Sequence, residues 1–361
     1  MLSLKRGWLL LLLTGLLVAT GCGRRPYETP IVTSSLQPDK ELFDRAVDDL
    51  EESRFTRARL ILQTLINTYP DSEYLSKAKL AVADSWYQEG GTSNLTQAEA
   101  EYRDFITFFP TLPESAEAQM RVAMIHYQGM EKPDRDVTHA RRAEQEFQKL
   151  ILSQPDSPFA PLAEQRLREV QEVLAQGLFD IARFYFIQGY DPGAQPRLKE
   201  LIERYPNFSQ ADSALYLMGR TAERSGEKNI PQAVEHYSSI VRDYPLGARV
   251  DEAKQRLTAL SAPIPEPSAD AVARMTYEST LAQSQSMMGK IFGGFTRGPD
   301  VTAAKGKIGM PTLTAQGAAQ PGALSAVFQP QRSTPAASST NPNNGVFLEQ
   351  VTESGTAGNS P

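Results

Sequence analysis

The sequence has few of the residues on which metal and thiol chemistry depends. Its 361 residues include one cysteine and three histidines. The single Cys22 excludes an internal disulfide framework and a cysteine-rich metal site. His126, His139 and His236 are not spaced to hold one metal from a single helical turn. Because no catalytic or phosphate-binding motif occurs either, we expect no metal, no cofactor and no enzymatic activity.

Long basic runs and long apolar runs are also missing. The formal net charge is -6 and no Lys/Arg run occurs, which argues against a nucleic-acid partner. The apolar run Leu9 to Val18 is too short to span a bilayer as a helix. It follows the basic Lys5 and Arg6 and precedes the small-residue stretch Ala19-Thr20-Gly21, so residues 1–21 are predicted to be a cleaved signal peptide.

The only cysteine lies directly after this predicted cleavage site. Cys22 at that position resembles the bacterial lipobox, in which the thiol is acylated and becomes the mature N-terminus. The alternative is an ordinary signal peptide with a chance cysteine. Several acyl chains, palmitate among them, would anchor the protein firmly. By resemblance to lipoprotein sorting, Gly23 in place of Asp implies the outer membrane, with residues 22–37 as a linker.

A repeated ending runs through the middle of the chain. Five segments close with a proline, which follows an aromatic residue in four of them. Twelve residues before each proline is an alanine, and large apolar residues lie eight and five before it. A small alanine lets two helices approach, large residues fill the space between them, and proline ends the second helix. The alanines are Ala58, Ala98, Ala143, Ala194 and Ala233, and the endings are Tyr69-Pro70, Phe109-Pro110, Gln154-Pro155, Tyr205-Pro206 and Tyr244-Pro245.

This pattern is typical of tetratricopeptide-like helical hairpins. We predict an all-α solenoid of five hairpins over residues 38–262, with repeats ending near 70, 110, 155, 206 and 245. The prolines are 39 to 51 residues apart, against 34 for the standard unit, so turns and linkers carry insertions. The pattern from about residue 159 to residue 188 is that of one long helix without an internal break, and this helix is predicted to join the third repeat to the fourth.

The composition changes after the last repeat. Residues 263–297 are predicted to be a linker with a helix from Ala269 to about Lys290. Within it, Met287 to Phe295 is either a short recognition element or simple disorder. Residues 298–361 are rich in Gly, Pro, Ala, Ser, Thr and Asn, and we expect a disordered low-complexity tail.

Two polar features have competing interpretations. The acidic stripe Glu41, Asp44, Asp48 and Glu52 is expected to be a solvated outer face rather than a carboxylate pair. His126 is expected to pack between helices.

In this repeat class the first helix of each hairpin lines a concave surface. Extending the proline register over the first three repeats gives apolar or aromatic residues with few charges, which suits a groove for varied peptides. The alternative is that insertions rotate the helices and these residues are ordinary core. The predicted substrate-peptide groove is Phe43, Val47, Leu50, Lys77, Leu80, Asp84, Tyr87, Met120, Met124 and Tyr127. The same projection for repeats four and five predicts a complex interface of Phe179, Arg183, Phe186, Tyr216, Arg220 and Glu223.

Several segments together resemble one known family. A lipobox cysteine and a short linker are followed by Glu41-Leu42-Phe43-Asp44-Arg45-Ala46, by Phe55-Thr56-Arg57-Ala58 and by Asn67-Thr68-Tyr69-Pro70-Asp71-Ser72. The likeness continues at Ala143-Glu144-Gln145-Glu146-Phe147, at Arg166-Leu167 and at Ile202-Glu203-Arg204-Tyr205-Pro206. Over residues 38 to 260 the sequence is similar to the BamD family, the tetratricopeptide lipoproteins of the outer-membrane β-barrel assembly (BAM) machinery.

The resemblance implies a non-enzymatic scaffold, lipid-anchored in the outer membrane on its periplasmic face. Its partners would be the periplasmic domains of a BamA-type barrel protein, other assembly lipoproteins and unfolded outer-membrane proteins. The N-terminal repeats would hold the unfolded substrates and the C-terminal repeats the complex. A second reading is another tetratricopeptide envelope lipoprotein that coordinates cell-wall or envelope assembly, and a third is an enzyme accessory or transport adaptor.

Overall fold

The computed structural model describes residues 37–284, 298–305, 307–308 and 310–313. Within these ranges all regular secondary structure is helical, which confirms the all-α prediction. The predicted signal peptide, Cys22 and Met287 to Phe295 lie outside the described residues. The described part belongs to one compact unit, Met1–Thr314, of the two into which the chain divides.

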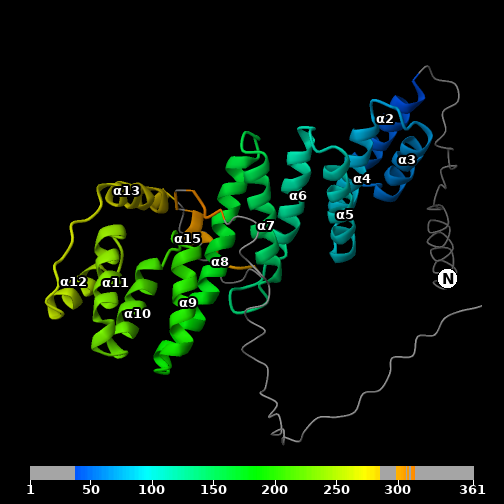
Figure 1. Cartoon of the computed structure of the whole chain (residues 1–361). Helices are drawn as coiled ribbons and strands as arrows, with labels where there is room; N and C mark the ends of the chain where they lie inside the picture. The colour runs from blue at the N-terminus through cyan, green and yellow to red at the C-terminus, as the bar shows by residue number, and fades with distance from the viewer. Residues whose placement is uncertain (1–36, 285–297, 306, 309, 314–361) are drawn as a thin grey trace, which may run out of the picture. The chain divides into compact units, whose positions relative to one another are not determined.

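The helices pack as successive hairpins in chain order (Figure 1). Neighbouring helices along the chain make the main contacts, as expected of a solenoid. The helices are α2 (Pro38–Glu51), α3 (Phe55–Thr68), α4 (Leu75–Glu89), α5 (Thr92–Phe108), α6 (Glu114–Gln128), α7 (Thr138–Ser153), α8 (Ala160–Ile187), α9 (Asp191–Arg204), α10 (Ala211–Arg224), the 3-10 turn η1 (Glu227–Asn229), α11 (Ile230–Asp243), α12 (Val250–Ala259), α13 (Ala269–Ser284) and α15 (Thr302–Lys305).

The repeated prolines end the second helix of each hairpin. In every case the residue before proline leaves helical geometry, with φ between -126° and -141° and ψ between 50° and 67°. The proline ring disfavours helical backbone in the preceding residue. At the first ending, the Tyr69 N–H still donates to the Leu65 carbonyl at 2.9 Å. Each of these helices therefore ends two residues before its proline.

The small and large residues of the repeat form the core. All five repeat alanines have no exposed surface, and the large residues at the two other repeat positions are at most 1% exposed. Four apolar clusters succeed one another along the array, joining α2–α4, α4–α6, α6–α10 and α10–α12. At Gly219 an added Cβ would lie 2.5 Å from a ring carbon of Tyr237. Close helix approach there requires glycine.

The long helix expected between the third and fourth repeats is α8, with 28 residues. It packs against both α7 and α9, so it belongs to two consecutive hairpins. None of the described helices is long and apolar enough to cross a membrane.

The chain beyond α12 folds back onto the array. The Ser268 N–H donates to the Arg242 carbonyl at 2.9 Å, and Arg274 donates to the Asp243 carbonyl at 3.0 Å, so α13 is attached to the end of α11. Part of the predicted tail, between residues 298 and 313, is described and contacts the array. There α15 contacts α8, and Leu313 packs on the core, because these residues find hydrogen-bond and apolar partners that their composition does not reveal.

Candidate functional site

The predicted peptide groove lies on α2, α4 and α6, and most of its side chains are half-buried rather than open. Lys77 is exposed. Met120 does not line an open groove as predicted. It is 6% exposed and packs in the cluster that contains Phe147 of α7. Side chains of α7 and α8 in the same cluster cover this position. The half-buried members are Phe43, Val47, Leu50, Leu80, Asp84, Tyr87, Met124 and Tyr127.

A cation and a hydrogen bond cover the aromatic ring on α4. The Arg121 guanidinium of α6 lies 5.3 Å from the centre of the Tyr87 ring. Gln128, also on α6, donates to the Tyr87 hydroxyl at 2.9 Å. The Tyr87 ring meets Tyr102 edge-on at 6.3 Å. Tyr87 therefore contributes to the contact between two consecutive hairpins, and only part of it faces solvent.

The same arrangement recurs further along the array. The Arg166 guanidinium of α8 lies 5.1 Å from the Tyr127 ring of α6. The Tyr127 hydroxyl donates to Glu169, which Arg166 also contacts at 2.8 Å. On the last hairpin, Arg249 lies 5.4 Å from the Tyr216 ring. We call Tyr87–Arg121, Tyr127–Arg166 and Tyr216–Arg249 the tyrosine–arginine pairs.

The arginines of these pairs are not among the predicted groove residues. Each follows its tyrosine by 33 to 39 residues, which is about one repeat. This regular offset was visible in the sequence. Its meaning depends on the first helices of consecutive hairpins lying side by side, and the structure supplies that arrangement.

Burial controls the protonation of the groove's polar groups. The Tyr102 hydroxyl donates to an Asp84 carboxylate oxygen at 2.5 Å. Burial raises the pKa of Asp84, and the hydrogen bond from Tyr102 only partly offsets this. Burial, followed by the nearby Asp84 charge, raises the pKa of Tyr102. Burial and the bond to Glu169 likewise raise the pKa of Tyr127, so these hydroxyls remain donors.

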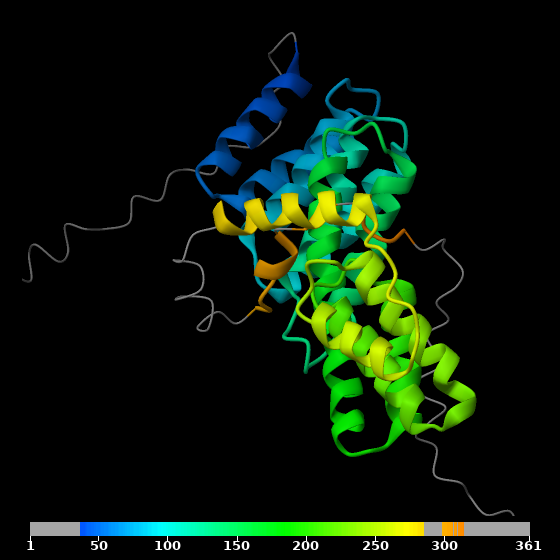
Figure 2. The same cartoon turned by 90° about the vertical axis from the view of Figure 1, so that its left-hand side faces the viewer.

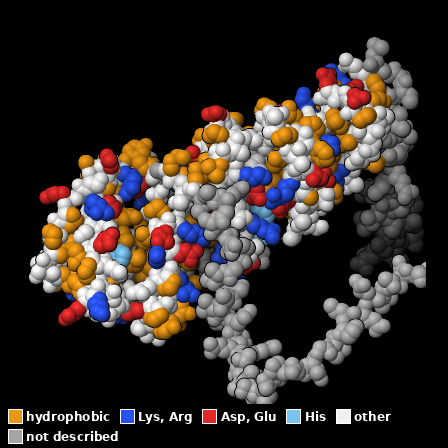
Figure 3. Space-filling view, viewed as in Figure 1, with side chains coloured by type: hydrophobic (Ala, Val, Ile, Leu, Met, Phe, Trp, Pro, Cys, Tyr) orange, Lys and Arg blue, Asp and Glu red, His pale blue; other side chains and the backbone are white. Residues whose placement is uncertain are grey.

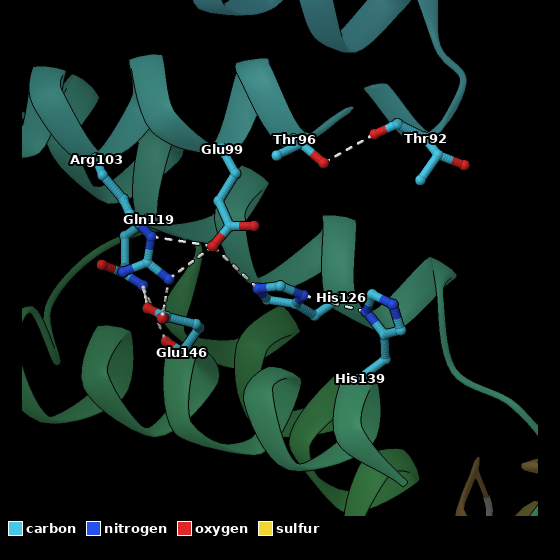
Figure 4. A network of polar contacts seen from close by, with 8 residues as sticks. All are labelled: Thr92, Thr96, Glu99, Arg103, Gln119, His126, His139 and Glu146. Atoms are coloured by element: carbon cyan, nitrogen blue, oxygen red, sulfur yellow. Dashed lines mark hydrogen bonds and ion pairs between the residues drawn. The ribbon is translucent and has the colours of Figure 1, made fainter. Parts of the chain in front are cut away.

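A partly buried polar network joins α5, α6 and α7 (Figure 4). Arg103 donates to Glu99 at 3.0 Å and to Glu146 at 2.5 Å. Gln119 donates to the same Glu146 at 2.8 Å. Since three helices each contribute a member, the network fixes how the second and third hairpins sit against each other.

His126 extends this network and is 1% exposed, so it packs between helices as predicted. Its Nε2 lies 3.2 Å from Glu99, and its Nδ1 lies 3.3 Å from Nδ1 of His139 (Figure 4). Burial lowers the pKa of His126, and the Glu99 charge opposes that shift. Among the residues described, no three His, Cys, Asp or Glu side chains are grouped to hold a metal ion.

The predicted complex interface on α8 and α10 is only partly at the surface. Phe179 does not lie at the surface as predicted. It is 3% exposed and its ring packs 5.8 Å from that of Phe208, because the α8–α9 contact covers it. Arg183 is exposed, and Phe186 lies half-buried beneath Arg224 at 4.2 Å. The three α10 members, Tyr216, Arg220 and Glu223, are half-buried.

Glu223 is held by two neighbours. It accepts a hydrogen bond from the Tyr237 hydroxyl at 2.7 Å and pairs with Arg256 of α12. Burial would raise the pKa of Glu223, but the hydrogen bonds from Arg256 and Tyr237 outweigh it and hold that pKa below its usual value. Glu223 therefore joins α10 to α11 and α12.

A more exposed apolar surface lies beside the predicted one. Ile181, Phe184 and Ile187 of α8 are 45%, 58% and 70% exposed, and Tyr190 in the following turn is 56% exposed. We call these four residues the α8 patch. The three helical members recur every third residue, so they share one side of the helix. That spacing was readable in the sequence, but the repeat register did not select it.

Charged and apolar side chains alternate elsewhere. On the face shown in Figure 3, hydrophobic side chains are interspersed with acidic and basic ones. An exposed cluster of large apolar side chains on a folded domain usually marks a binding surface. The fold and its surfaces thus define the class: an array of helical hairpins suited to binding other proteins.

Comparison with known proteins identifies the family. The model of the YfiO family, described as outer membrane lipoprotein, matches residues 36–231, from α2 into α11, and the chain belongs to this family. It is 24% identical over 196 residues to the outer membrane protein assembly factor BamD of Haemophilus influenzae, covering 52% of this chain and 74% of the relative. It is 25% identical over 246 residues to BamD of Vibrio cholerae, covering 65% of this chain and 98% of the relative.

Proposed function

We propose that this chain is an outer membrane protein assembly factor that acts as a non-enzymatic scaffold. Membership of the outer membrane lipoprotein family and likeness to proteins named as BamD support the role. In this proposal an acylated Cys22 anchors the chain to the periplasmic face of the outer membrane. The helical array binds a BamA-type barrel protein, other assembly lipoproteins and unfolded outer-membrane proteins.

The exposure of the α8 patch is the observation that supports a contact with the assembly complex. Its four large side chains are each at least 45% exposed, and they adjoin the predicted interface residues Arg183 and Phe186. Aromatic and aliphatic anchors next to an arginine have the composition of an interface centre. We assign this surface to the periplasmic domains of the barrel-forming partner.

The α2, α4 and α6 face is proposed to hold unfolded substrate segments. Phe43 packs 5.3 Å from Tyr74, and Tyr87 and Tyr127 carry arginines on their rings. Half-buried aromatic rings beside cations can bind both an apolar side chain and a carboxylate. The C-terminal strand of a barrel protein, with an aromatic end and a free carboxylate, would offer both groups.

The test of the complex interface is a titration with the isolated periplasmic domains of the barrel partner. Phe184→Ser with Ile187→Ser should weaken binding by about a hundredfold, since two exposed anchors are removed. Leu60→Ser on α3 is the matched control, because Leu60 is 48% exposed but lies far along the chain from α8. Equal affinities for all three proteins would exclude this surface.

The substrate face is tested separately with a peptide from a barrel protein's C-terminal strand. Phe43→Ala with Tyr87→Ala should reduce its affinity by about tenfold. An unchanged affinity would remove this assignment without affecting the α8 patch.

The anchor is tested in cells. Cys22→Ser should release the protein from the outer membrane, because acyl chains at that residue supply the membrane affinity. Fractionation of the envelope measures it. Retention of the variant in the outer membrane would show that the acyl chains are dispensable.

A further inference from the structure

A short segment after α15 lies against α7, α8 and the end of α9. It comprises residues 307–308 and 310–313, well beyond residue 231 where the family match ends. The preceding helix α15 lies beside α8 in two perpendicular views (Figures 1 and 2). The segment has no regular secondary structure, yet it carries several hydrogen bonds to the array.

Two glutamine side chains bind the main chain of Thr312. Gln171 of α8 donates to the Thr312 carbonyl at 2.7 Å and accepts from the Thr312 N–H at 3.2 Å. Gln148 of α7 donates to the same carbonyl at 3.2 Å. The Gln171 amide thus pairs with both main-chain groups of Thr312, as a neighbouring strand would. Such a contact requires an extended main chain and is independent of the side chain presented.

The main-chain contacts recur at every second residue. Asn207, just after α9, donates to the Met310 carbonyl at 2.9 Å. Glu278 of α13 accepts from the Ile308 N–H at 3.2 Å and from the Lys307 ammonium at 3.0 Å. A period of two is the spacing of an extended chain with one edge toward its partner. The array therefore holds the main chain of the segment at residues 308, 310 and 312.

Apolar contacts add to this recognition at two positions. Pro311 is buried, and Leu313 packs against the main apolar cluster. The Met310 side chain, by contrast, is 61% exposed. The bound segment thus combines main-chain recognition with a proline and a leucine two residues apart.

The receiving side chains are buried when the segment is in place. Gln171 is then 6% exposed and Gln148 is 7% exposed. A buried amide is costly without hydrogen-bond partners, and the segment supplies such a partner to both amides. Gln171 also donates to Glu144 at 3.3 Å, which orients its amide.

We propose that Gln148, Gln171 and Asn207 form a binding site for an extended peptide, and that residues 307–308 and 310–313 belong to its tethered ligand. The ligand class is an extended segment with proline and leucine two residues apart. Because this ligand is part of the same chain, its effective concentration is on the order of millimolar. A second segment of the same kind gains access only when the tethered one leaves. The site is separate from the α8 patch and from the α2, α4 and α6 face.

The test uses the full chain and a fluorescent peptide of residues 305–315 added in trans. In wild type the tethered segment competes, so we expect weak binding. Thr312→Pro with Leu313→Ser removes the N–H that donates to Gln171 and the apolar anchor, and should raise the peptide's affinity by about tenfold or more. A peptide N-methylated at the Thr312 nitrogen should not bind this variant.

Gln171→Ala, added to the released variant, should abolish peptide binding. Gln165→Ala is the matched control: Gln165 lies on the same helix and donates to Glu169, not to the segment. Binding that survives Gln171→Ala, or that is equal in wild type and the released variant, would overturn the proposal.

A second measurement does not depend on the Gln171→Ala substitution. Thr312→Pro lies outside the helical array, so it leaves the hairpins intact. It should speed tryptic cleavage after Lys307 by about tenfold, because the segment must leave the surface to enter a protease. Cleavage at the wild-type rate would show that the segment is not held by these contacts.

Discussion

Aromatic side chains are covered on the face of α4 and α6 but exposed at the far end of α8. On α4 and α6, Tyr87 and Tyr127 lie under arginines from the next hairpin and make hydrogen bonds through their hydroxyls. At the end of α8, Phe184 and Ile187 have large exposed fractions. Aromatic content therefore does not by itself show how much of a ring is open to a partner. The exposed area of each ring depends on whether the next repeat supplies a cover.

The largest expected effect is on stability, and it should differ between a covered and an uncovered ring of the same helix. Phe105 of α5 is 1% exposed, and Phe108 is 65% exposed. Phe105→Ala should lower the free energy of unfolding by about 3–5 kcal/mol, since it leaves a cavity in the core. Phe108→Ala should change it by no more than about 0.5 kcal/mol. Urea denaturation measures both, and similar losses would contradict the assigned burial.

The α8 patch should dominate binding of an apolar dye. Phe184→Ser with Ile187→Ser should reduce the fluorescence of a bound naphthalene sulfonate dye by about twofold, because the largest exposed apolar cluster on α8 is removed. Phe43→Ser should change it little, since Phe43 packs on Tyr74. A greater loss from Phe43→Ser would reverse the comparison between the two regions.

A smaller effect is expected from uncovering Tyr87. Arg121→Gln removes the cation from that ring and should cost about 0.5–1 kcal/mol of stability. Arg135→Gln, at an exposed position in the α6–α7 linker, serves as control. If thermal melting gave the same result for both variants, the tyrosine–arginine pair would contribute nothing.

The stability of the fold should depend on pH through the buried His126. The pKa of His126 is lowered by burial, so the folded state prefers the neutral imidazole. Its contribution to stability is present above the unfolded value of 6.5 and is lost as pH falls through the lowered folded pKa. Melting temperatures should therefore fall between pH 7.5 and pH 5.5.

Two variants test whether these histidines cause the fall in melting temperature with pH. The fall should be smaller in His126→Gln and smaller still when His236→Gln is added, because burial also lowers the pKa of His236. An undiminished slope in the double variant would mean that other groups control it.

Much of the array was predictable because its signals are local. An alanine, two large residues and a proline recur in register, and their steric consequences act within one hairpin. The hairpin cores and the long α8 helix followed directly. The groove residues were less predictable, because Met120 and Phe179 are covered by neighbouring helices. A one-dimensional register does not include the rotation of one hairpin against the next.

The sequence by itself thus determined the class of fold, the helix ends and the core positions, since backbone sterics and side-chain size act over a few residues. Only the tertiary structure decided which surface residues are free. The arginines over Tyr87 and Tyr127 come from the following hairpin, and the partner of Gln171 comes from residue 312. Contacts between residues so far apart in sequence depend on how the helices pack.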